Sequence, residues 1–148
     1  MNLSNELSQI NTVFIDTAPI IYYIEAHPEF GPLAQEIVSA FQSGDINAFS
    51  SVITLTEVLP KPIGGGDEKL ARRFAEFLKR AENLTMVEIS ESIAESAGKL
   101  KGLHPFLKTV DAIQIAASLD VGANAFITND KKLRQIKEIK ALILADYL

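Results

Sequence analysis

Four acidic residues lie far apart in this 148-residue chain, each where an apolar run ends or a helical pattern begins. They are Asp16, Glu57, Asp111 and Asp130. In a parallel α/β sheet such positions gather at the carboxyl edge of the strands, where ligands bind. Four carboxylates collected there repel one another unless a hard cation holds them together. The pattern therefore predicts a divalent-metal site that could act on phosphodiester bonds.

Each acid taken singly also fits a structural role. Asp16 and Asp130 could each cap a helix, and Asp111 lies in a first helical turn, where negative charge is favoured. Thr54 and Glu57 have capping-box spacing, so Glu57 could bind a backbone N–H. Together, however, the acids favour a functional site. Asp16 and Asp111 are embedded in apolar sequence, and a buried carboxylate needs a partner, yet no Lys or Arg precedes residue 61.

Short apolar stretches rich in Val, Ile and Phe predict the strands that position these acids. The predicted strands are residues 12–15, 46–50, 85–89, 125–128 and 141–144. Helical patterns separate them, at residues 19–26, 32–42, 68–81, 92–101 and 110–119. Strands that alternate with helices indicate βαβ crossovers and a parallel sheet covered on both faces. The stretch Pro60–Gly66 is predicted to be a loop or hinge.

Composition excludes several classes of protein. The chain has no cysteine, which excludes disulfides, thiolate metal sites and a cysteine nucleophile. It contains no Gly-x-Ser-x-Gly, P-loop or His-Glu-x-x-His motif. No apolar run approaches the ~20 residues of a membrane span, and the first residues lack a signal-peptide pattern. We therefore expect a single cytoplasmic domain over residues 1–148.

The net charge of −5 argues against a generic nucleic-acid binder, but the charge is unevenly distributed. All 14 Lys and Arg residues follow position 60, with clusters in residues 61–80 and 131–140. Such clusters can contact phosphates. The candidate contacts are Arg72, Arg73, Lys131 and Lys132. The competing interpretation is that both clusters are the solvated faces of amphipathic helices.

Four sequence blocks, in order and at compatible spacings, resemble the PIN domain family of small metal-dependent ribonucleases, which includes VapC-type toxins. The blocks are residues 14–23, 50–59, 108–117 and 126–131, and each contains one of the four acids. The resemblance extends over nearly the whole chain. Val110 is one departure, because many relatives carry proline before the third acid.

The resemblance implies a three-layer α/β/α domain with a central parallel sheet of four or five strands. It also implies a PIN-like site that holds one or two Mg²⁺ or Mn²⁺ ions, which agrees with the preference of hard ions for oxygen ligands. Asp16 and Asp111 would be the primary ligands. Glu57 and Asp130 would complete the site or orient the attacking water.

By the same resemblance, Thr17 and Thr128 would hydrogen-bond a carboxylate or a water. The expected function is a divalent-metal-dependent endoribonuclease that hydrolyses single-stranded RNA and is the toxin of a toxin–antitoxin pair. Its partners would be RNA, an antitoxin protein and a second copy of the chain in a homodimer. The alternative is a non-catalytic PIN-like binding module.

Overall fold

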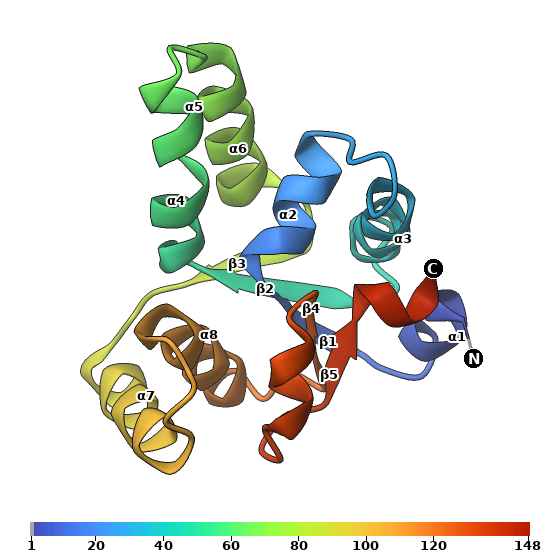
Figure 1. Cartoon of the computed structure of the whole chain (residues 1–148). Helices are drawn as coiled ribbons and strands as arrows, with labels where there is room; N and C mark the ends of the chain where they lie inside the picture. The colour runs from blue at the N-terminus through green and yellow to red at the C-terminus, as the bar shows by residue number, and fades with distance from the viewer. Residues whose placement is uncertain (1) are drawn as a thin grey trace.

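The structure, a computed structural model, describes residues 2–148. Its centre is a five-stranded sheet with the order β3-β2-β1-β4-β5, in which every pair of neighbours is parallel (Figure 1). The predicted parallel sheet is confirmed, and each predicted strand is found to within two residues at either end. The strands are β1 (Thr12–Ile15), β2 (Asn47–Ser51), β3 (Leu84–Val87), β4 (Ala125–Thr128) and β5 (Ala141–Ile143).

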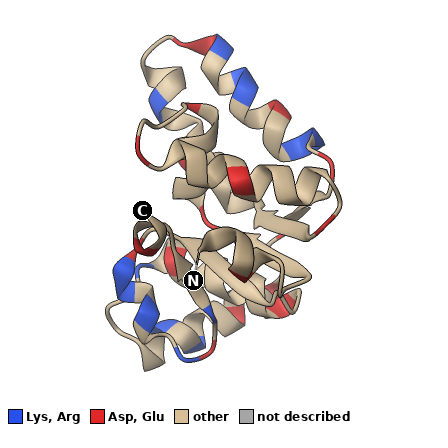
Figure 2. Cartoon of the chain, turned by 90° about the vertical axis from the view of Figure 1, so that its right-hand side faces the viewer, with Lys and Arg blue, Asp and Glu red and all other residues tan. Residues whose placement is uncertain are grey.

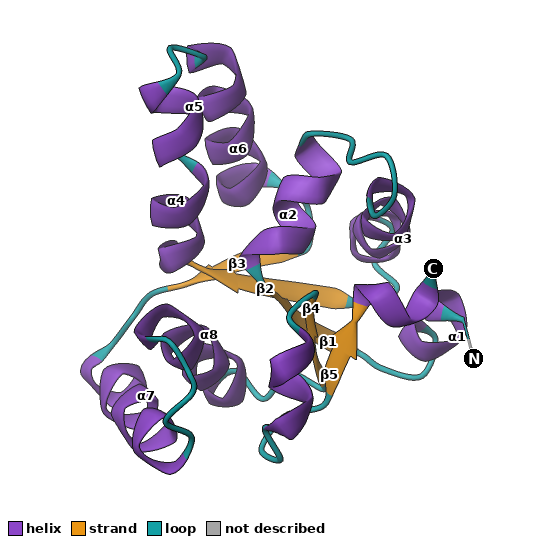
Figure 3. Ribbon diagram, viewed as in Figure 1, coloured by secondary structure: helices purple, strands orange, loops and turns teal. Residues whose placement is uncertain are grey.

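Helices cover both faces of this sheet, so the domain has three layers. Helices α2, α3, α4 and α6 lie on one side, and α7 and α8 lie on the other (Figure 3). None of the helices formed by residues 2–148 is long and apolar enough to cross a membrane. The α-helices are α1 (Leu3–Leu7), α2 (Thr17–Ile24), α3 (Gly31–Gln42), α4 (Val52–Val58), α5 (Pro60–Gly64), α6 (Glu68–Arg80), α7 (Glu91–Leu103) and α8 (Thr109–Asp120), and the 3₁₀ helices are η1 (Lys131–Gln135) and η2 (Leu144–Tyr147).

The prediction of a loop or hinge at residues 60–66 is wrong for most of this segment, because α5 occupies residues 60–64. Pro60 is tolerated there because it starts the helix, where its missing N–H would have no intrahelical partner. Gly66 ends this segment with a φ of 75°, a left-handed conformation that favours glycine. The glycine run therefore terminates a helix instead of forming a hinge.

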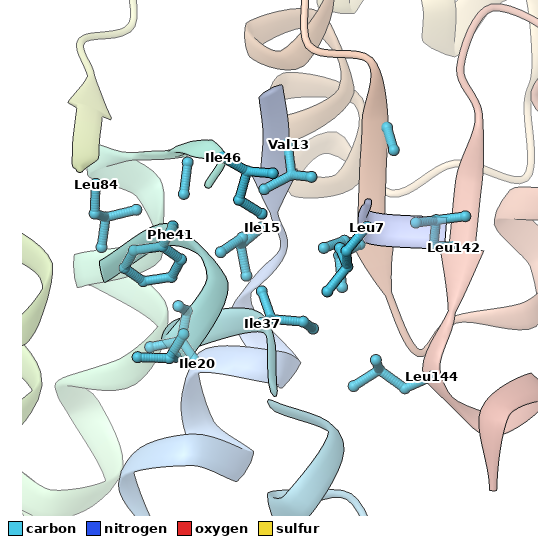
Figure 4. Close-up of a cluster of buried hydrophobic side chains, with 14 of the residues drawn as sticks. Leu7, Val13, Ile15, Ile20, Ile37, Phe41, Ile46, Leu84, Leu142 and Leu144 are labelled. Atoms are coloured by element: carbon cyan, nitrogen blue, oxygen red, sulfur yellow. The ribbon is translucent and has the colours of Figure 1, made fainter. Parts of the chain in front are cut away.

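Strand β1 is buried on both of its faces. Side chains along a strand alternate between the two faces, so Val13 and Ile15 face the layer that contains α3. There they pack in one cluster with Ile37 and Phe41 (Figure 4). Phe14 belongs to the opposite cluster, against α7 and α8. This packing fixes the end of β1, and with it the position of the residue that follows.

The order of the strands reverses at β1. The chain places β2 and β3 on one side of β1 and then β4 and β5 on the other. The carboxyl edge between β1 and β4 is therefore the topological switch point, where open α/β sheets bind their ligands. Ile15 pairs with Ile127 at this edge, which brings the residues after both strands together.

Candidate active site

The structure brings the four predicted acids to this carboxyl edge. Asp16 follows β1 directly, and its backbone N–H donates to the carbonyl oxygen of Ile127 at 2.9 Å. Asp111 lies in the first turn of α8, and Asp130 caps η1. Glu57 lies near the end of α4. Asp16, Asp111 and Asp130 are half-buried, whereas Glu57 is exposed.

Asp16 is held in place by two hydrogen bonds. Its Oδ1 accepts from the backbone N–H of Thr17 at 2.9 Å, and its Oδ2 accepts from Oγ1 of Thr128 at 2.8 Å. Both bonds favour the charged carboxylate, yet burial raises its pKa from 3.8 to about 6. The negative charges of Asp111 and Glu57 contribute to this rise. Asp16 is therefore an ordered carboxylate whose ionised form is costly in the metal-free protein.

Asp111 belongs to the same electrostatic cluster. Burial raises its pKa, and the charges of Asp130 and Glu57 act in the same direction. The nearby Lys108 lowers this pKa in part. The charges of the four acids therefore act on one another, although Asp16 also caps α2 and Asp130 also caps η1.

Glu57 does not occupy the capping-box position that its spacing from Thr54 suggested. Ser51 caps α4 instead, where its Oγ accepts from the backbone N–H of Ile53 at 3.1 Å. Glu57 is therefore in the last turn, and its Oε1 accepts from Oγ1 of Thr17 at 2.6 Å. The capping interpretation is wrong, because the helix starts earlier than Thr54.

Thr17 and Thr128 each contact two of the four acids. Thr17 donates its backbone N–H to Asp16 and its hydroxyl to Glu57. Thr128 donates its hydroxyl to Asp16 and accepts from the backbone N–H of Asp130 at 3.1 Å. The two threonines thus connect three of the acids by hydrogen bonds.

The donor set is suited to a divalent cation, although no three His, Cys, Asp or Glu side chains within residues 2–148 are arranged as a ready coordination sphere. All four candidate ligands are carboxylates, which hard ions such as Mg²⁺ and Mn²⁺ prefer. None of the ion pairs formed within the described chain includes one of these acids. The cluster therefore carries negative charge that a cation would neutralise.

The family model of the PIN domain matches residues 13–139, a range that includes all four acids. The chain belongs to the PIN domain family. Among curated proteins no significant match is found.

Solved structures share the fold of this PIN domain. A chain of the VapBC2 complex of Rickettsia felis, bound to a DNA fragment from its promoter, superposes with a TM-score of 0.73 at 16% identity, covering 89% of this chain and 98% of that one. A chain of a toxin–antitoxin complex from Klebsiella pneumoniae superposes with a TM-score of 0.67 at 23% identity, covering 89% of this chain and 97% of that one. Mycobacterium tuberculosis VapC20, a toxin that cleaves the sarcin–ricin loop, superposes with a TM-score of 0.63 at 16% identity, covering 77% of this chain and 86% of that one.

The two basic clusters of this PIN domain lie on different parts of its surface (Figure 2). Lys131 and Lys132 are exposed on η1, directly after Asp130. Arg72 and Arg73 are exposed on α6, and Arg73 also donates from Nη2 to a carbonyl oxygen at the end of α2 at 2.9 Å. The lysine pair is thus next to the acids in the chain, while the arginine pair is on a separate helix.

Sequence reasoning missed a group of buried polar residues beneath the acids. Ser50, Ser51, Thr54 and Gln114 are each 0% exposed and hydrogen-bond to one another. One signal was available, because Gln114 lies in the middle of the apolar run Ala112–Ala117. A polar side chain in such a helix requires a buried partner.

Proposed function

We propose that this PIN domain is a divalent-metal-dependent endoribonuclease that hydrolyses phosphodiester bonds in single-stranded RNA and serves as the toxin of a toxin–antitoxin pair. The carboxylate cluster at the switch point is the observation that carries the proposal. It places a half-buried Asp16 of raised pKa among three other acids without a bound basic partner. Such a cluster destabilises the metal-free fold, which argues for a function that requires it.

Each acid has a distinct part in this proposal. Asp16 and Asp111 would be the primary ligands of Mg²⁺ or Mn²⁺, and Glu57 and Asp130 would complete the site or orient water. When bound, the ion would supply Lewis acidity at the phosphate and lower the pKa of the attacking water. Thr17 would hold Glu57 through its hydroxyl.

RNA and an antitoxin are the proposed partners. PIN-domain proteins are generally nucleases, and two of the solved structures with this fold are toxin–antitoxin complexes. Exposed Lys131 and Lys132 would contact the phosphates of RNA close to Asp130, and Arg72 and Arg73 would extend the contact. A homodimer in the cytoplasm remains part of the proposal. A short DNA-binding protein encoded immediately upstream would identify the antitoxin.

Cleavage of a mixed RNA pool tests this function. Protein verified free of antitoxin is incubated with Mn²⁺ or with EDTA, and the products are separated on a denaturing gel. We expect cleavage with Mn²⁺ alone, and its loss in Asp16→Asn and Asp111→Asn. Asp120→Asn is the matched control, because Asp120 is an exposed acid at the other end of α8 and should leave cleavage unchanged.

The same assay separates the enzyme from a PIN-like binding module. RNA that stays intact with Mn²⁺ at every protein concentration, while still binding the parent protein, would support the binding module. Cleavage that persists in both aspartate variants would instead identify a contaminating nuclease.

A further inference from the structure

A one-way chain of hydrogen bonds crosses the buried interior beneath the acids. Gln114 Nε2 donates to Oγ1 of Thr54 at 2.8 Å, and this hydroxyl lies 2.9 Å from Oγ of Ser50. Ser50 donates its hydroxyl hydrogen to the carbonyl oxygen of Ile15 at 3.2 Å. Since Ser50 has only that hydrogen to donate, Thr54 must be the donor between the two hydroxyls. The chain therefore runs from α8, through α4 and β2, to the end of β1.

Three of the four residues in this series of hydrogen bonds are close in sequence to an acid. On the two helices the separation is three residues, which places both side chains on the same side of the helix. On β1 the two residues are adjacent, so the bonded carbonyl belongs to the peptide that leads into the acid. The pairs are Gln114 with Asp111, Thr54 with Glu57, and Ile15 with Asp16.

The amide of Gln114 holds the first turn of α4 at two points. Besides its bond to Thr54, its Oε1 accepts from the hydroxyl of Ser51. Ser51 is also the N-cap of α4, because its Oγ accepts from the backbone N–H of Ile53 at 3.1 Å. Rotation or sliding of α8 against α4 would break both bonds of the amide at once.

The hydrogen bonds of Gln114 lie in an otherwise apolar part of the contact between α8 and the rest of the core. The neighbours of Gln114 on α8, Ile115 and Ala116, are buried and apolar. An apolar side chain at position 114 could pack in several similar arrangements, whereas a buried amide is satisfied in only one. No buried side-chain nitrogen or oxygen within residues 2–148 lacks a hydrogen-bond partner, so this arrangement is fully satisfied.

We propose that Gln114, Thr54 and Ser50 form a positioning network that fixes the spacing of Asp111, Glu57 and Asp16 for divalent-cation binding. These residues act through the elements that carry the acids and do not touch the reacting atoms. The proposal rests on the function proposed above. It makes Gln114 and Thr54 positioning residues. Replacing their polar groups should weaken cation binding while the protein remains folded.

Paired variants at position 54 provide the test. Thr54→Val keeps the shape of the side chain and removes the hydroxyl, and Thr54→Ser keeps the hydroxyl. Gln114→Leu removes the amide at similar volume. Ile37→Val, in the cluster between β1 and α3, is the control for a weakened core, because the side chain of Ile37 makes none of the hydrogen bonds of the network. Circular dichroism and melting in EDTA establish that each variant is folded.

Two quantities are measured: the dissociation constant for Mn²⁺ alone, by titration calorimetry, and kcat and KM for an RNA oligonucleotide. For Thr54→Val and Gln114→Leu we expect the Mn²⁺ dissociation constant to rise, and kcat to fall, each by roughly 10- to 100-fold, as for other residues that orient metal ligands. KM should change little. Thr54→Ser and Ile37→Val should retain the parent values.

Parent-like Mn²⁺ affinity and kcat in both network variants, with only a lower melting temperature, would reduce the network to core packing and overturn the inference. Failure of the proposed function is a different result, because the parent itself would then bind no Mn²⁺ or cleave no RNA. If the parent binds Mn²⁺ without cleaving RNA, the calorimetry alone still decides whether the network positions the acids.

Discussion

Replacing Asp16 with asparagine should stabilise the metal-free protein at neutral pH. The carboxylate is half-buried and is repelled by Asp111 and Glu57, so its ionised form opposes folding. Asparagine removes the charge and remains a good N-cap for α2. Its side-chain oxygen can still accept from the backbone N–H of Thr17.

The structure gives the magnitude and the pH range. A rise in pKa from 3.8 to about 6 corresponds to roughly 3 kcal/mol of lost stability once Asp16 is fully ionised. Because the folded protein binds the proton more tightly, this cost is absent below the unfolded pKa of 3.8 and complete only above about pH 6. The weakened bond to Thr128 offsets about 1 kcal/mol. We therefore expect a net gain of about 2 kcal/mol at pH 7.5, or roughly 4–8 °C in melting temperature.

Thermal melts in EDTA at pH 7.5 and pH 4 measure this gain. The advantage of Asp16→Asn should be largest at pH 7.5 and should vanish near pH 4, where the parent binds the proton itself. Asp120→Asn should change stability by less than about 0.5 kcal/mol at either pH, since Asp120 is exposed. An asparagine variant that is less stable than the parent at pH 7.5 would refute the reasoning, because Asp16 would then act as an ordinary stabilising cap.

Three further outcomes follow from the same site. Mn²⁺ at a hundredfold excess over its dissociation constant should stabilise the parent by about 2.7 kcal/mol, and Asp16→Asn should lose most of that gain in a thermal melt. Charge reversal of Lys131 and Lys132 to Glu should weaken RNA binding and flatten its salt dependence, measured by fluorescence anisotropy; unchanged affinity at low salt would return them to the solvated face of η1. Thr17→Val should lower kcat roughly tenfold by releasing Glu57, whereas Thr17→Ser should not.

The sheet was predictable from the sequence because its strands are buried on both faces. A strand such as β4, with every residue buried, must be apolar throughout, and that produces a recognisable short run. Helices α1, α4 and α5 were not among the predicted helices, because they are only five to seven residues long and too short for a helical pattern to be recognised. The prolines of α5 also suggested a loop, although proline is compatible with a first helical turn.

The convergence of the acids was also predictable, because carboxyl ends of parallel strands meet at one edge. The positions of Asp16 and Asp130 followed from the predicted strands alone, because each acid lies just after a strand. The contact between Glu57 and Thr17 was not predictable, since it depends on α4 beginning at Val52 and not at Thr54. Boundaries of this kind are determined by capping contacts such as that of Ser51, which a sequence pattern locates poorly.

The cost of ionised Asp16 is consistent with its position after the central strand β1 and not after an edge strand. β1 pairs with strands on both sides, and Val13, Phe14 and Ile15 are essentially inaccessible to solvent. Full burial of such side chains contributes about 1.5–3 kcal/mol each, so the three together exceed the roughly 3 kcal/mol cost of ionised Asp16. An edge strand has one paired neighbour and would shift or fray under the same repulsion. The central strand can therefore hold a destabilising carboxylate in a fixed position without a cation, and binding of the proposed cation would add to the stability of the fold.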